Sequence, residues 1–169
     1  MLTAAIVVAS GLVAGQTASD IPPEPRIVTI VGAEEPERFP EWYRWEAALS
    51  ALSRQRPPAR ALEVEDEVRD YLLQEADALV ERWNVFVVEA EAAAVPLREQ
   101  GLSEDELYRA LYRFEIEYRY AVLAARERIR FRLPPETVGA FEAGWMAEAI
   151  AASTVTLTGP AVELFFEPY

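Results

Sequence analysis

Apolar residues recur at steps of three and four positions along two long stretches of the chain. The first series comprises Val68, Leu72, Ala76, Leu79, Trp83, Phe86 and Ala90, and the second comprises Leu107, Leu111, Phe114, Tyr118, Ala121, Ala125 and Ile129. This spacing places each series on one face of an α-helix. The pattern therefore predicts two long helices, over about residues 62–94 and 104–131.

Prolines, a glycine and a capping sequence indicate where these helices begin and end. Pro96 and Gly101 are expected to close the first helix. Ser103 and Glu106 form the sequence of a capping box, in which each side chain accepts a backbone N–H of the other residue, so the second helix should start there. Pro134 and Pro135 should end it.

The two apolar series match when the chain folds back on itself at residues 95–102. In this arrangement Leu79 pairs with Tyr118 and Trp83 pairs with Phe114. The acidic first half of the first helix then lies beside the arginine-rich end of the second. Both patterns predict an antiparallel helical hairpin, and therefore an all-α fold.

Proline positions divide the remainder of the chain. A shorter helix is predicted over 41–56, after Pro40, and another over 136–152, so that the helical domain covers 41–153. Residues 19–40 carry several prolines and are expected to form an extended arm, in which the β-branched run at 26–31 can pair as one short strand. The C-terminal tail, 154–169, is expected to be extended and docked.

The first 18 residues have the composition of a targeting segment. No charged side chain occurs from Leu2 to Ala18, and an apolar run is followed by small residues. This is typical of a secretion signal or of an uncleaved membrane anchor, and it predicts a periplasmic or other extracytoplasmic location, with membrane contact through residues 1–18. Gln16 stands where a bacterial lipobox would have its cysteine, so lipid attachment is not expected. The alternative is a buried apolar segment of a cytoplasmic fold.

The composition narrows the possible chemistry. The 169-residue chain contains no cysteine and no histidine. It therefore lacks the residues of thiol and Ser–His nucleophile systems and the commonest transition-metal ligands, and no metal or cofactor is expected. The net charge of −13 argues against a nucleic-acid partner, because phosphates would repel the chain.

Two pairs of carboxylates are the remaining candidates for catalysis. Glu89 and Glu91 are two residues apart, as are Glu115 and Glu117. A step of two residues on a helix turns the side chains by about 200°, so the members of each pair should face apart. We therefore expect no catalytic residues, although a hydrolase using only carboxylate, tyrosine, serine or arginine groups stays as a lesser alternative.

Aromatic and apolar clusters outside the two series are candidate contacts for a partner protein. They are Trp42, Tyr43 and Trp45 in the first short helix, Tyr108 and Tyr112 in the second long helix, and Leu164, Phe165 and Phe166 near the C-terminus. These side chains must be buried internally or against a partner. The sequence thus suggests an accessory or assembly subunit on the outer face of a bacterial membrane complex, for example a photosynthetic or respiratory one. A free periplasmic binding or chaperone-like protein is the alternative.

Overall fold

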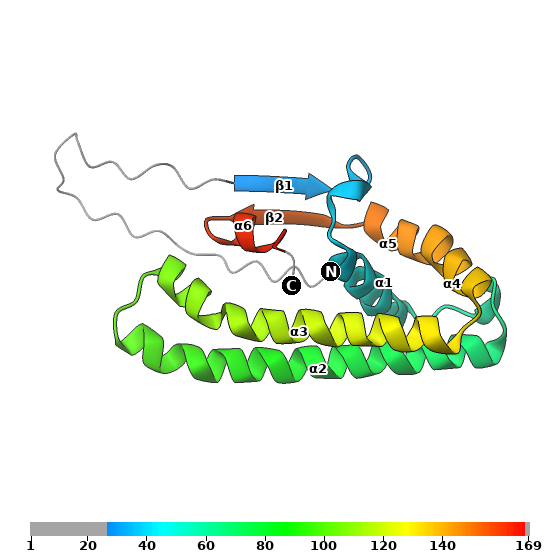
Figure 1. Ribbon diagram of the computed structural model, residues 1–169, viewed down its shortest axis with the longest axis horizontal. Helices are drawn as coiled ribbons and strands as arrows, with labels where there is room; N and C mark the ends of the chain where they lie inside the picture. The colour runs from blue at the N-terminus through cyan, green and yellow to red at the C-terminus, as the bar shows by residue number, and fades with distance from the viewer. Residues whose placement is uncertain (1–26, 168–169) are drawn as a thin grey trace.

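Two long antiparallel helices form the main axis of the protein (Figure 1). The computed structural model describes residues 27–167. Helix α2 spans Asp66–Glu99, helix α3 spans Glu104–Arg132, and the two pack against each other. The predicted all-α hairpin is confirmed. The signal or anchor predicted over residues 1–18 lies outside the described residues, as does the first part of the predicted arm.

Helix α2 differs from the prediction at both ends. The preceding chain forms a 3₁₀ turn, η2 (Ala59–Ala61), and has a positive φ of 54° at Glu63, so the helix begins at Asp66 instead of Leu62. At its other end it continues through Pro96 to Glu99. A proline lacks the N–H that would bond to the carbonyl four residues before it, and its ring crowds that carbonyl. Here this affects the Ala92 carbonyl, close to the end of the helix, and the helix continues for three residues beyond Pro96.

The connection between α2 and α3 is short and capped. Gly101, with a φ of 77°, adopts the left-handed conformation that commonly ends a helix. The predicted capping box opens α3: the Ser103 backbone N–H donates to Glu106 Oε2 at 2.9 Å, and the Glu106 N–H donates to Ser103 Oγ at 3.4 Å. These contacts fix the point at which the chain reverses.

Aromatic rings fill the seam between the two long helices. The ring centroids of Trp83 and Tyr118 are 4.8 Å apart, and those of Phe86 and Phe114 are 6.4 Å apart. The sequence pattern had paired Trp83 with Phe114, so the observed ring contacts are displaced by about one helical turn. Each apolar series repeats every three or four residues, so a shift of one helical turn still places apolar residues opposite apolar residues. The packing of the aromatic rings then determines which register is adopted.

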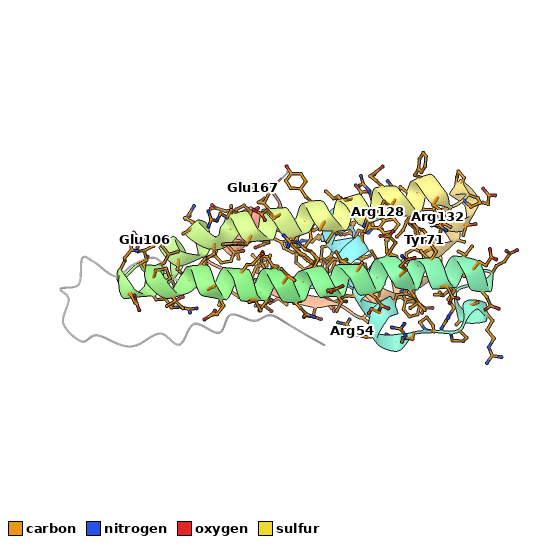
Figure 2. All side chains as sticks on the ribbon, turned by 90° about the horizontal axis from the view of Figure 1, so that it is seen from below. Arg54, Tyr71, Glu106, Arg128, Arg132 and Glu167 are labelled. Atoms are coloured by element: carbon orange, nitrogen blue, oxygen red, sulfur yellow. The ribbon has the colours of Figure 1, made fainter. Side chains whose placement is uncertain are left out.

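The charges of the hairpin are arranged as predicted. Arg128 of α3 donates to Glu75 of α2, with Nη2 2.8 Å from Oε2. One turn further along, the Arg132 guanidinium lies 4.3 Å from the centre of the Tyr71 ring. Figure 2 shows Tyr71, Arg128 and Arg132 at the same end of the hairpin, where the acidic start of α2 meets the basic end of α3.

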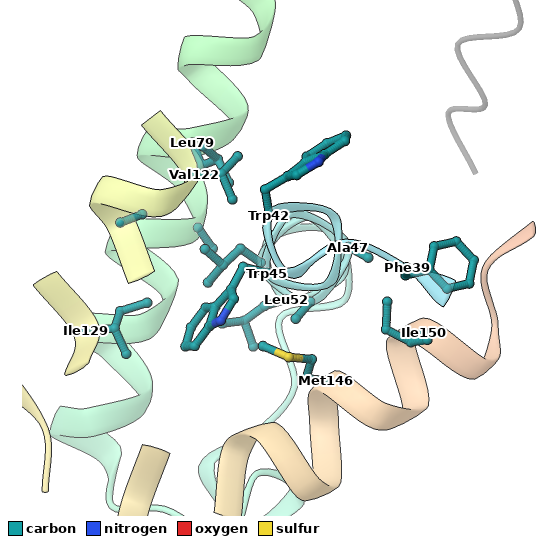
Figure 3. Packing of buried hydrophobic residues seen from close by; sticks show 14 of the residues in the cluster. Phe39, Trp42, Trp45, Ala47, Leu52, Leu79, Val122, Ile129, Met146 and Ile150 are labelled. Carbon is teal, nitrogen blue, oxygen red and sulfur yellow. The ribbon is translucent and has the colours of Figure 1, made fainter. Parts of the chain in front are cut away.

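Helix α1 (Glu41–Gln55) packs across both long helices and supplies much of the core. It follows Pro40, as the sequence predicted, and the 3₁₀ turn before it, η1 (Pro36–Arg38), lies in the segment predicted to be extended. Trp45, Leu49 and Leu52 on its inner face are at most 1% exposed. Figure 3 shows the Trp45 ring between α1 and the long helices.

The second predicted short helix is continuous but contains a wider turn. Helix α4 (Pro135–Phe141) passes through a π-helical turn, η3 (Glu142–Met146), into α5 (Ala147–Ala151). The observed span is close to the predicted 136–152. Within the π-helical turn, Trp145 Nε1 donates to the Ala48 carbonyl oxygen of α1 at 2.9 Å, which ties this element to the core.

A two-stranded antiparallel ribbon joins the two ends of the described chain. Strand β1 (Ile27–Val31) lies in the predicted strand region and pairs with β2 (Thr154–Thr158) in the predicted tail, with Ile27 opposite Thr158. Ile30 and Leu157 point into the common core. The sequence pattern indicated an extended backbone at both places but did not indicate that the two segments pair.

Gly32 allows the ribbon to approach the end of α5 closely. Its N–H donates to the Ser153 carbonyl oxygen at 2.9 Å. A Cβ atom at this position would lie 1.8 Å from the carbonyl oxygen of Ile150. No larger residue fits unless one of the two backbone segments moves.

The C-terminal tail is only partly extended, which corrects the prediction for 154–169. After β2, the positive φ of 53° at Gly159 turns the chain into a short helix, α6 (Ala161–Leu164), followed by Phe165. The short helix turns the Phe165 side chain into the core, where it is 5% exposed.

Candidate interaction surfaces

The aromatic start of α1, a candidate docking site in the sequence, is part of the core of the described chain. Trp42 is 6% exposed and Trp45 is 1% exposed. Tyr43 is half-buried, and its ring stacks on that of Phe39 with the centroids 4.9 Å apart. In this conformation the two tryptophan rings already have internal partners and present little surface to another protein.

The tail residues divide between the core and the surface. The Phe165 ring packs edge-on against Trp42 and Tyr43, with centroid distances of 5.4 Å and 5.6 Å. Leu164 is half-buried, whereas Phe166 is 43% exposed. Of the candidate partner contacts in the tail, Phe165 is therefore anchored internally, while Phe166 stays accessible.

Tyr108 and Tyr112, the two tyrosines of α3 that were candidate partner contacts, are also engaged internally. The Tyr112 hydroxyl donates to the Leu164 carbonyl oxygen at 2.9 Å, and the Tyr108 hydroxyl donates to Glu115 Oε2 at 3.0 Å. Both rings are half-buried. Burial, followed by the negative charge of Glu115 and the hydrogen bond to it, raises the pKa of Tyr108 far above its ordinary range. This hydroxyl therefore stays protonated and serves as a hydrogen-bond donor.

A fully buried arginine, Arg119, connects these residues. Its Nη1 donates to the Leu164 carbonyl oxygen at 2.9 Å and to the Tyr112 hydroxyl at 3.0 Å, and its Nη2 forms an ion pair with Glu115. The guanidinium lies 4.3 Å from the centre of the Trp42 ring. Within residues 27–167, Arg119 Nε and Trp42 Nε1 are buried without a hydrogen-bond partner. The arrangement holds the tail against α1 and α3.

The sequence contained a signal for this cluster. Tyr108, Tyr112, Glu115 and Arg119 follow steps of four, three and four residues, which place them on one face of α3 beside the apolar seam. Polar residues on a helix face usually contact solvent, whereas here Arg119 is fully buried, and both Arg119 and Tyr112 donate to the Leu164 carbonyl oxygen at the end of α6. This helix is far away in the sequence, so its position could not be foreseen.

The outer face of α2 carries a second apolar line, which the sequence analysis had not singled out. Val85, Val88, Ala92 and Val95 follow steps of three, four and three residues. They are exposed: Val85 by 41%, Val88 by 69% and Val95 by 49%. They lie about half a helical turn away from the aromatic seam that faces α3. We call these four residues the α2 outer stripe.

The two candidate carboxylate pairs do not form a joint site. Arg82 lies near Glu89, with Nη1 3.7 Å from Oε2, while Arg98 binds Glu91 at 2.7 Å. The second pair is divided in the same way: Glu115 pairs with Arg119 inside the protein, and Glu117 lies 3.6 Å from Arg82 at the surface. The predicted opposite orientation is thus observed. Within residues 27–167, no group of three or more potential metal-ligating side chains gathers.

Two surface depressions do not have the character of an apolar ligand pocket. The larger, of about 580 Å³, is open and is lined mainly by polar side chains, including Arg56, Arg69 and Asp77. Arg56 and Ser53 both donate to Asp77 there, which fixes the end of α1 against α2. The smaller, of about 220 Å³, is lined chiefly by alanines between α2 and α3. Ligand pockets are usually more enclosed and more apolar.

Comparison of the chain with protein-family models, with curated proteins and with solved structures gives no match. Within the described part of the chain, no helix combines the length and the apolar composition needed to cross a bilayer. The fold therefore defines the class, an all-α hairpin protein with an exposed apolar helix face, and the case for function rests on the surface itself.

Proposed function

We propose that the protein is a non-catalytic, extracytoplasmic interaction subunit, an accessory or assembly component docked on the outer face of a bacterial membrane complex. The α2 outer stripe is the observation that carries this proposal. Burial of a valine side chain is worth roughly 1.5–3 kcal/mol when complete, so a line of exposed valines on a rigid helix favours association. Its extent over three helical turns distinguishes it from a single exposed apolar residue.

Further support comes from the rigidity of the surface that carries the stripe. The contacts of the Trp83 and Phe86 rings with Tyr118 hold this part of α2 against α3. A preformed helix face loses little conformational entropy on binding. The extracytoplasmic location rests separately on the composition of residues 1–18, which predicts export or anchoring.

Co-purification from native membranes tests the proposal. The wild-type chain should recover stoichiometric partner subunits, whereas Val85→Glu/Val88→Glu should lose them, because both glutamates would be buried in the interface. Phe131→Glu is the control, since Phe131 is 96% exposed on α3 and lies outside the stripe. Far-ultraviolet circular dichroism should show equal helicity in all three proteins.

Two results would contradict the proposal. Recovery of the wild-type protein only as a free soluble monomer would exclude a stable subunit. Undiminished partner recovery with Val85→Glu/Val88→Glu would exclude this surface. The intact mass of the native protein, measured in the same preparation, determines whether residues 1–18 persist.

A further inference from the structure

The α2 outer stripe ends in a carboxylate on each side. The same alternating steps that connect its residues extend to Glu81 before Val85 and to Glu99 after Val95. The two glutamates are exposed and lie 18 residues apart on one line of the helix, a separation of about 27 Å. Within residues 27–167, neither Glu81 nor Glu99 forms an ion pair or a side-chain hydrogen bond.

The charges along the sides of the stripe are already neutralised. Arg82 lies near Glu89 on one side, and Arg98 binds Glu91 on the other. A partner therefore meets an apolar line with paired charges beside it and an unpaired negative charge at each end. This pattern selects a partner by charge at two defined points.

The pattern disfavours three occupants. A second copy of α2 would bring glutamates against glutamates at both ends, whether it packed in parallel or antiparallel. The apolar N-terminal segment Leu2–Gly15 contains no basic side chain to complement Glu81 or Glu99. Anionic lipid headgroups would be repelled by the carboxylates.

We infer that the α2 outer stripe binds a helix of a partner protein that carries an apolar seam between two basic residues. This inference rests on the proposed interaction function and specifies the partner's chemistry. Long apolar side chains of the partner pack over Ala92, whose methyl group permits close approach, and arginine or lysine side chains at the ends pair with Glu81 and Glu99. Helices that pack in this way interlock at steps of three and four residues.

Fluorescence anisotropy with two synthetic helical peptides tests the inference. Both peptides carry a leucine seam at steps of three and four; one has lysines 18 residues apart at its ends, and the other has glutamates there. The full chain should bind the lysine-ended peptide about three- to tenfold more tightly, as expected for two exposed ion pairs. Glu81→Lys/Glu99→Lys should reverse this preference.

The matched control is Glu136→Lys/Glu148→Lys, which makes the same change in net charge at two exposed positions of α4 and α5. It should retain the wild-type preference for lysine ends. Val88→Glu should abolish binding of both peptides. An equal effect of the two charge-reversal variants would overturn the inference, because the preference would then reflect only the overall charge of −13.

The outcomes also separate this inference from the proposed function. Suppose Val88→Glu abolishes peptide binding but Glu81→Lys/Glu99→Lys leaves the preference for the lysine-ended peptide unchanged. The stripe is then a docking surface, but a requirement for basic residues at the ends of the partner helix is excluded. If Val88→Glu has no effect, both proposals fail. A wild-type dimer in light scattering that Val88→Glu dissociates would identify a second copy as the occupant and overturn the inference.

Discussion

The guanidinium of Arg119 lies against the face of the Trp42 indole, 4.3 Å from the ring centre, and this contact joins α3 to α1 beneath the C-terminal segment. A buried charge is costly unless it is paired and hydrogen-bonded. Glu115 supplies the opposite charge, and the Leu164 carbonyl and the Tyr112 hydroxyl accept the remaining Nη1 bonds. The tail is thus held by a charged group that has no alternative solvent contact.

Replacement of this arginine should strongly destabilise the protein. Arg119→Met removes the ion-pair partner of Glu115 and one of the two donors to the Leu164 carbonyl, so we expect a loss of about 3 kcal/mol in the free energy of unfolding. Urea denaturation measures it. Arg109→Met, at an exposed position of the same helix, should change stability by less than about 0.5 kcal/mol. Equal midpoints for the two variants would show that the cluster contributes nothing to stability.

Two adjacent phenylalanines test whether the tail belongs to the core. Phe165→Ala should cost about 3–5 kcal/mol, because it empties a site between Trp42 and Tyr43. Phe166→Ala, at a position 43% exposed, should cost less than about 1 kcal/mol. Thermal melting compares them directly. If the two variants melt at the same temperature, Phe165 is not an anchor of the native state.

The close approach at Gly32 gives a third pair of variants. Gly32→Ala places a methyl group within 1.8 Å of the Ile150 carbonyl oxygen, so either the ribbon or α5 must shift, at a cost of about 3 kcal/mol or more. Gly139→Ala has open space around the new methyl group and should stabilise α4 by about 0.5–1 kcal/mol. If the denaturation midpoints of Gly32→Ala and Gly139→Ala both shifted in the same direction from that of the wild type, this account would be contradicted.

A carboxyl in α1 should make stability depend on pH. Burial raises the pKa of Glu46 above its ordinary 4.5, and the hydrogen bonds of Ser50 and Tyr118 together with the charge of Arg54 only partly oppose this. The nearby Glu46 charge contributes in turn, after burial, to raising the pKa of the Tyr118 and Tyr43 hydroxyls.

The folded protein therefore holds the Glu46 proton more tightly than the unfolded chain does. The free energy of unfolding should rise as pH falls from neutrality through the raised pKa, and this contribution should level off below about pH 4.5. Glu46→Gln should stabilise the protein at pH 7 and flatten this part of the profile. Urea denaturation across the pH range measures both effects; an unchanged profile in the variant would exclude Glu46 as their source.

The sequence predicted the hairpin because two regular apolar series and a capping box act locally and are easily recognised. It predicted the register less well, since a shift of one turn preserves the apolar match while it exchanges Phe114 for Tyr118 beside Trp83. The aromatic residues of α1 and the tail were recognised as side chains that must be buried. Their mutual burial depends on α6, which four residues form after Gly159, and no short-range pattern indicates where so short a helix packs.

The outer stripe of α2 was visible in principle. Apolar residues on two opposite faces of one helix exceed what a two-helix contact can bury. The series through Trp83 and Phe86 explained the inner face of α2 alone, and Val85, Val88 and Val95 were not considered as a second face. The exposure of these valines becomes evident only once the positions of α1 and α6 are known.

The pairing of β1 with β2 also orders events during folding. Thr29 and Thr156, whose hydroxyls are 3.2 Å apart across the ribbon, are separated by 127 residues in the chain. The hairpin can form from local contacts as soon as α3 has left the ribosome, whereas β1 has no strand partner until residues 154–158 have also been made. The β-branched strand β1 is thus the first described segment to be synthesised and among the last to gain its backbone hydrogen-bond partners. Until β2 arrives, β1 is available to any other strand, and a chaperone that shields residues 27–31 would protect the nascent chain from mispairing.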